Sequence, residues 1–223
     1  MKKIALTLLP ILALMSGCGS TNSYLANKST TVEMYHIFDI KTALPASAVA
    51  QAAASGLSQN TNSISSNTPL QIGVAVPEKA GRFNIVDIGA KLGNSGAGAF
   101  MQLAAMQNGG AAFKAASCET AAWTARAQRT ISNASNLNLY ACLYKYKQGY
   151  ELDIYAVFEK TEGGLTQVSR DLAYKLVGTP EEWVNKTIWD MVRSVEKATN
   201  TRIQRLEGQP ELGAEPAIAQ LGK

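Results

Sequence analysis

Alternating apolar and polar residues in the second half of the chain constrain its fold most strongly. Small and aromatic residues alternate over 119–129, and two clearer runs follow at 137–146 and 150–159. Such a period of two is typical of strands that bury one face. The apolar positions of the two clearer runs are Leu137, Leu139, Ala141 and Leu143, then Leu152, Ile154, Ala156 and Phe158. These segments predict three strands of an antiparallel sheet.

The pairing of the two clearer strands can be predicted from their connection. A turn at Gln148-Gly149 places Leu143 opposite Ile154, so that apolar residues meet across the strands. A slip of one residue would mix the faces. We predict a further strand over 168–176, which completes a C-terminal four-stranded meander.

A long helix is predicted after this meander. Thr179-Pro180-Glu181-Glu182 offers an N-cap, a first-position proline and a capping-box acid. Apolar residues then recur at helical spacing as far as Ala198, and Gly208 with Pro210 ends the helix. We expect the helix to cover the sheet, with Leu139, Ile154 and Phe158 against Ile188, Met191 and Val195. The fold class is therefore α+β.

The first half of the chain shows weaker patterns. Alternation over 32–40 predicts a strand, and Pro45 opens an Ala-rich helix that ends at Gly56. Residues 57–68 are expected to form a polar loop, and 71–76 with 82–88 a hairpin. The order of strand, helix, several antiparallel strands and long C-terminal helix is similar to helix-grip folds, which enclose an apolar ligand.

A glycine-rich segment spans 89–117. It predicts a short helix near 97–107, bracketed by glycines. This helix either packs on the core or forms a mobile lid or partner-docking loop.

The N-terminus has the form of an export signal. Lys2 and Lys3 precede an apolar run of about a dozen residues, too short to span a bilayer, which takes about 20. Ser16-Gly17-Cys18 after that run resembles the lipobox of bacterial lipoproteins, a resemblance that covers residues 1–20. It implies a diacylglyceryl group on the Cys18 thiol, cleavage before Cys18, and acylation of the new amino terminus, for example with palmitate. An ordinary signal peptide with an incidental cysteine is the alternative.

The residue patterns and the lipoprotein resemblance together predict a domain plan, and the resemblance also implies a location. Residues 1–17 are the signal peptide, 18–30 a tether, 31–208 a single α+β domain and 209–223 a disordered tail. Gly19, which is not Asp, resembles the pattern of an outer-membrane lipoprotein. We expect a lipid-anchored protein of the cell envelope with its domain in the periplasm.

Charge and cysteine content narrow the remaining possibilities. The net charge of +4 falls to +2 once Lys2 and Lys3 are removed, too small to indicate nucleic-acid binding. Cys118 and Cys142 are predicted to form a disulfide in an oxidising compartment. The alternatives are two buried thiols or a metal pair, but the chain has one histidine and no CxxC spacing.

The predicted disulfide meets a geometric difficulty. If 119–129 pairs directly with 137–146, Cys142 lies near Ala125 rather than near Cys118. Either Cys118 folds back in the preceding loop, or these two strands are not simple neighbours.

Candidate functional residues are few. The sequence has no phosphate-binding loop, nucleophile elbow or zinc-protease motif, so no catalytic, cofactor or metal residue is predicted. His36 lies on the apolar side of its strand, typical of a core histidine. A binding surface is predicted from the row Tyr140, Tyr144, Tyr146 and Tyr155. The alternative is that another strand or the 89–117 segment covers this row.

Three functions are compatible with these patterns. The leading prediction is a non-catalytic, lipid-anchored envelope protein that binds a protein partner or assists envelope assembly. The second is a carrier of an apolar ligand or lipid, with a pocket lined by Leu139, Ile154, Phe158 and Met191. The third is a periplasmic hydrolase, which would need a cleft with His36 beside a carboxylate or hydroxyl.

Overall fold

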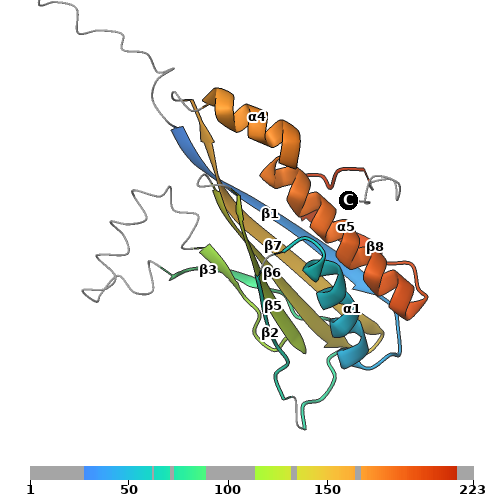
Figure 1. Cartoon of the computed structure of the whole chain (residues 1–223). Coiled ribbons are helices and arrows are strands. Elements are labelled where there is room, and N and C mark those ends of the chain that lie inside the picture. Colours follow the sequence, from blue (N-terminus) through green and yellow to red (C-terminus); the bar gives the residue numbers. More distant parts are fainter. Residues whose placement is uncertain are drawn as a thin grey trace, which may run out of the picture.

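A six-stranded antiparallel sheet forms the centre of the protein (Figure 1). The computed structural model describes residues 28–61, 63–70, 73–88, 114–131, 135–163 and 167–214 of the chain. The strand order is β2-β5-β6-β7-β1-β8, and β3 and β4 form a separate two-stranded sheet. The strands are β1 (Lys28–Ile40), β2 (Ser63–Asn67), β3 (Asn84–Asp87), β4 (Lys114–Ser117), β5 (Trp123–Ile131), β6 (Ser135–Tyr146), β7 (Gly149–Glu162) and β8 (Gln204–Gln209). The predicted α+β class is confirmed.

β1 occupies the place beside β7 that the meander prediction gave to residues 168–176. It pairs with β7 along its whole length, from Lys28 opposite Glu162 to Ile40 opposite Tyr150. The predicted fourth strand is wrong, because residues 167–177 form helix α4 (Gln167–Val177). Val168 and Leu172 lie four residues apart, which fits a helix as well as a strand. The consecutive strands of the meander are therefore β5, β6 and β7.

The connection between β6 and β7 differs from the predicted one. Gly149 begins β7, and Leu143 lies opposite Leu152 rather than Ile154. The pairing is shifted by two residues. Because the side-chain period is also two, the apolar residues stay on the predicted face.

Two helices lie side by side over one face of the sheet, α1 (Ala46–Ser58) and α5 (Pro180–Thr199) (Figure 1). The capping box is confirmed: Thr179 Oγ1 accepts from the Glu182 N–H at 3.1 Å, and the Thr179 N–H donates to Glu182 Oε2 at 2.9 Å. The predicted contact is confirmed too, because one buried cluster holds Leu139, Ile154, Phe158, Ile188, Met191 and Val195.

The C-terminal region is more ordered than predicted. α5 ends at Thr199, because Asn200 adopts a left-handed conformation with φ of 50°. The chain then forms β8, which pairs with the edge of β1. Leu212 packs against the core, and the Trp189 indole N–H donates to the Gly213 carbonyl at 3.0 Å. The prediction of a disordered tail from residue 209 is therefore wrong for 209–214.

Other predicted segments are corrected or lie outside the described residues. Lys28–Thr30, predicted as part of the tether, belong to β1. The hairpin of 71–76 with 82–88 does not form, because β3 pairs with β4 instead. The predicted polar loop 57–68 contains the edge strand β2. The lipobox and the predicted helix near 97–107 lie outside the residues that the structure describes.

Candidate functional site

The face of the sheet opposite the helices carries a second core. Tyr140, Tyr144, Tyr146 and Tyr155 lie on this face and are all buried. A covering layer, defined here as residues 77–83 with β3 and β4, packs over Tyr140, Tyr144 and Tyr155, whereas the Tyr146 hydroxyl bonds to Asp39 and Lys41. The Phe83 ring lies 5.8 Å from that of Tyr155, centroid to centroid. The predicted tyrosine surface is therefore corrected: Tyr140, Tyr144 and Tyr155 are covered by other segments, which was the alternative, and Tyr146 is also buried.

Charged groups join the covering layer to the sheet. Arg82 Nε lies 2.8 Å from Glu151 Oε1, and the same guanidinium contacts Glu207 of β8. The Phe83 N–H donates to Asp153 Oδ2 at 3.2 Å, while Asp153 Oδ1 has no hydrogen-bond partner. Burial raises the pKa of Asp153 to about 7; the Phe83 N–H opposes this rise and the Glu151 charge adds to it.

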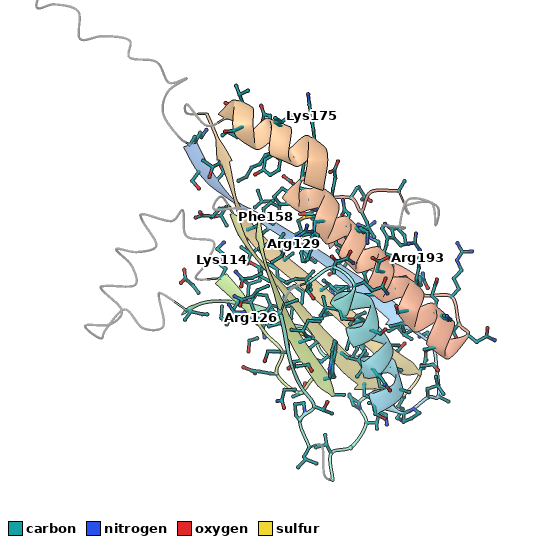
Figure 2. All side chains as sticks on the ribbon, in the orientation of Figure 1. Lys114, Arg126, Arg129, Phe158, Lys175 and Arg193 are labelled. Carbon is teal, nitrogen blue, oxygen red and sulfur yellow. A yellow bond between two sulfur atoms is a disulfide. The ribbon has the colours of Figure 1, made fainter. Side chains whose placement is uncertain are left out.

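An ion pair also joins β4 of the covering layer to β1. Lys114 of β4 pairs with Glu33 of β1, which also accepts from the Tyr155 hydroxyl at 2.7 Å. Figure 2 shows Lys114 and Arg126 on the opposite side of the sheet from Arg193 of α5.

Cys118 and Cys142 form the predicted disulfide, with their Cα atoms 5.5 Å apart. Although Cys142 pairs with Thr124 in the sheet, Cys118 reaches it because the chain reverses at Thr120, whose φ is 63°. The Ala121 N–H donates to the Cys118 carbonyl in this turn. Folding back of Cys118 thus resolves the geometric difficulty.

A pocket of about 330 Å³ opens at the edge of the covering layer, whose residues 77 and 79–81 form part of its wall. Its wall combines Tyr144 and Thr120 with residues 74–77, and Lys79 and Lys145 supply positive charge. Its lining residues are Val74, Ala75, Val76, Pro77, Lys79, Ala80, Gly81, Thr120, Tyr144 and Lys145. The pocket therefore offers an apolar wall with two cations.

Exposed apolar side chains gather in the same part of the sequence. Of the nine large apolar side chains that are exposed among the described residues, five lie between residues 70 and 88, so this segment exposes more of them than the rest of the described chain. These five, which we name the 70–88 surface, are Leu70, Val74, Val76, Ile85 and Ile88. Val74 is 65% exposed and Ile85 49%, whereas Val86 packs on the second core.

The sequence did not predict this surface, because residues 71–76 and 82–88 were expected to pair with each other as a hairpin. Val74 and Val76 would then alternate as strand residues with one buried face. In the structure the strand partner of 84–87 is 114–117, and residues 74–77 form no strand. Apolar alternation alone does not show whether a partner strand exists.

His36 lies in the core, as predicted. It is fully buried, and neither ring nitrogen has a hydrogen-bond partner. A Cβ added at Gly208 would lie 2.2 Å from its Nδ1 atom, so the ring lies directly against the backbone of the neighbouring strand β8. Burial lowers the pKa of His36 to about 4; Arg205 lowers it further and Glu211 opposes this. This setting does not supply the accessible base that a hydrolase requires.

The residues proposed for an apolar-ligand pocket are part of the main core. Leu139, Ile154, Phe158 and Met191 are all fully buried and belong to one cluster with both helices. The pocket described above is lined by other residues. The helix-grip resemblance stays a prediction.

Comparison with known proteins does not assign a family or a function to this chain. Within the described ranges no three His, Cys, Asp or Glu side chains are placed to hold a metal ion. None of the helices described is long and apolar enough to cross a membrane. No protein-family model, curated protein or solved structure matches this chain.

Proposed function

We propose that this chain is a non-catalytic, lipid-anchored protein of the bacterial outer membrane, with its domain in the periplasm. It binds a protein partner through the 70–88 surface and so helps to assemble an envelope structure. The lipobox resemblance at Ser16-Gly17-Cys18 supports the anchor. The single observation that carries the binding role is the exposure of Val74 and Val76 on the wall of the pocket.

The chemistry of the pocket defines the partner. An apolar side chain of the partner enters between Val76, Ala80 and Tyr144, while a carboxylate beside it meets Lys79 or Lys145. Full burial of one such aliphatic side chain contributes about 1.5–3 kcal/mol. A buried anchor with a charged rim is the usual arrangement of an interface hot spot.

Site-specific photocrosslinking in living cells tests this role. We expect benzoylphenylalanine at Val74 or Ile85 to give one protein adduct of defined mass, because both side chains are exposed on the proposed interface. The same amino acid at Leu44, an exposed position outside the 70–88 surface, is the control and should give no such adduct.

A second substitution makes the test specific. Val76→Glu removes an apolar contact from the pocket wall, and its carboxylate competes with that of the partner for Lys79 and Lys145, so it should abolish the adduct formed at Val74. An adduct that also forms at Leu44, or one that survives Val76→Glu, would contradict the proposed interface.

A further inference from the structure

Helix α4 lies at the end of the sheet where β1 begins (Figure 1). The pairing of β1 with β7 sets this position, because Lys28 lies opposite Glu162 and α4 starts five residues later, at Gln167. The Gly163 N–H donates to Gln167 Oε1 at 3.0 Å across this short connection. The first described residue of the chain and α4 are therefore near neighbours.

α4 exposes apolar side chains that no described element covers. Val168 is 82% exposed and Leu172 is 61% exposed. They lie four residues apart, so they share one face of the helix. Lys175 is also exposed and lies three residues after Leu172 (Figure 2). An apolar pair beside a lysine is typical of helices that lie in a membrane interface, where the lysine reaches the anionic headgroups.

The length of the chain between Cys18 and β1 indicates what lies against the exposed face of α4. In the proposed function Cys18 is held in the bilayer, and ten residues, 18–27, join it to Lys28. A fully extended segment of that length reaches at most about 35 Å. β1 itself spans about 40 Å, so the opposite end of the sheet, near Leu44, lies far from the attachment point.

We propose that α4 docks on the membrane that holds the Cys18 lipid, with Val168 and Leu172 inserted at the headgroup boundary. This inference rests on the proposed lipid anchor and adds an orientation to it. The end of the sheet with Lys28 faces the bilayer, and the end with Leu44 faces away from it.

Tryptophan quenching in liposomes tests this orientation. The full lipidated protein is reconstituted into phosphatidylethanolamine and phosphatidylglycerol vesicles with brominated acyl chains. Val168→Trp and Leu172→Trp should lose the fluorescence of the added tryptophan, relative to unbrominated vesicles. Leu44→Trp, which replaces an exposed leucine at the far end of the sheet, should keep it. The three native tryptophans are subtracted with the unsubstituted protein.

Each other outcome has a definite meaning. Lipidated protein in which Val168→Trp and Leu172→Trp are unquenched, or in which Leu44→Trp is quenched equally, overturns the docking and leaves the anchor intact. A dimer in solution that Leu172→Glu dissolves, without quenching in vesicles, assigns the face to a second copy and also overturns the docking. An unmodified Cys18 overturns both proposals.

Discussion

Replacing Gly56 by alanine should destabilise the protein by about 3 kcal/mol or more, although glycine-to-alanine changes inside helices usually stabilise. Gly56 lies where α1 crosses α5. A Cβ there would lie 2.4 Å from the Asp190 carbonyl oxygen and 2.5 Å from Met191 Cα. Both are backbone atoms of a helix, so the two helices must move apart. Urea unfolding at constant pH measures the loss.

The interactions beside this crossing should be lost together with it. Asn60 Nδ2 donates to Asp190 Oδ2 at 2.7 Å, and the Trp183 indole N–H donates to the Asn60 carbonyl at 2.7 Å. Both bonds need the close approach of α1 to α5. Gly213→Ala is the matched control, because its nearest atom would be the Asn185 side-chain nitrogen at 3.3 Å, which can move. Equal stability of Gly56→Ala and Gly213→Ala would contradict this packing.

Asp153 and His36 should give opposite dependences of stability on pH. The pKa of Asp153 rises to about 7 in the folded protein, so stability is highest below the unfolded pKa near 4 and falls as pH rises to about 7. The pKa of His36 falls to about 4, so its contribution is complete above about 6.5 and is lost as pH falls to about 4. Between pH 4 and 6.5 the two effects largely cancel.

Single substitutions should separate the two opposite dependences of the free energy of unfolding on pH. Relative to the unsubstituted protein, Asp153→Asn should gain about 4 kcal/mol between pH 4 and 7, because Asp153 must take up a proton on folding in this range and asparagine does not. His36→Gln should change in the opposite direction by about 3 kcal/mol between pH 6.5 and 4, gaining relative stability as pH falls. Unfolding by urea at each pH measures both, with Asp171→Asn as an exposed control. Parallel pH curves for all four proteins would rule out the buried titrations.

The elements that could be predicted from the sequence are those in which apolar residues recur at a regular spacing over a long run of neighbouring residues. β6 and β7 each carry four alternating apolar residues, and α5 adds a capping box to its apolar stripe. The disulfide between Cys118 and Cys142 followed from compartment chemistry rather than from geometry. In each case the sequence evidence for the element or the disulfide lies in neighbouring residues or in the composition of the chain.

The elements that were missed depend on distant partners. β2 is a run of serines and asparagine around one isoleucine, and β8 has only Leu206 as an aliphatic residue. Such edge strands exist because β5 and β1 offer them unpaired backbone groups, not because of their own pattern. The same holds for the covering layer, since burial of the tyrosine row depends on Phe83 and β4 reaching it from elsewhere in the chain.

The proposed lipid on Cys18 is the central claim about this protein, and the mass of the N-terminal peptide tests it most directly. Trypsin releases residues 18–28 if the signal is cut before Cys18, because Lys28 is the first lysine or arginine after it. In protein extracted from membranes, this peptide should carry a diacylglyceryl group and an amide-linked acyl chain. Cys18→Ser should remove the lipid and release the protein from the membrane fraction. A peptide from the native protein with an unmodified Cys18 would contradict the lipid anchor.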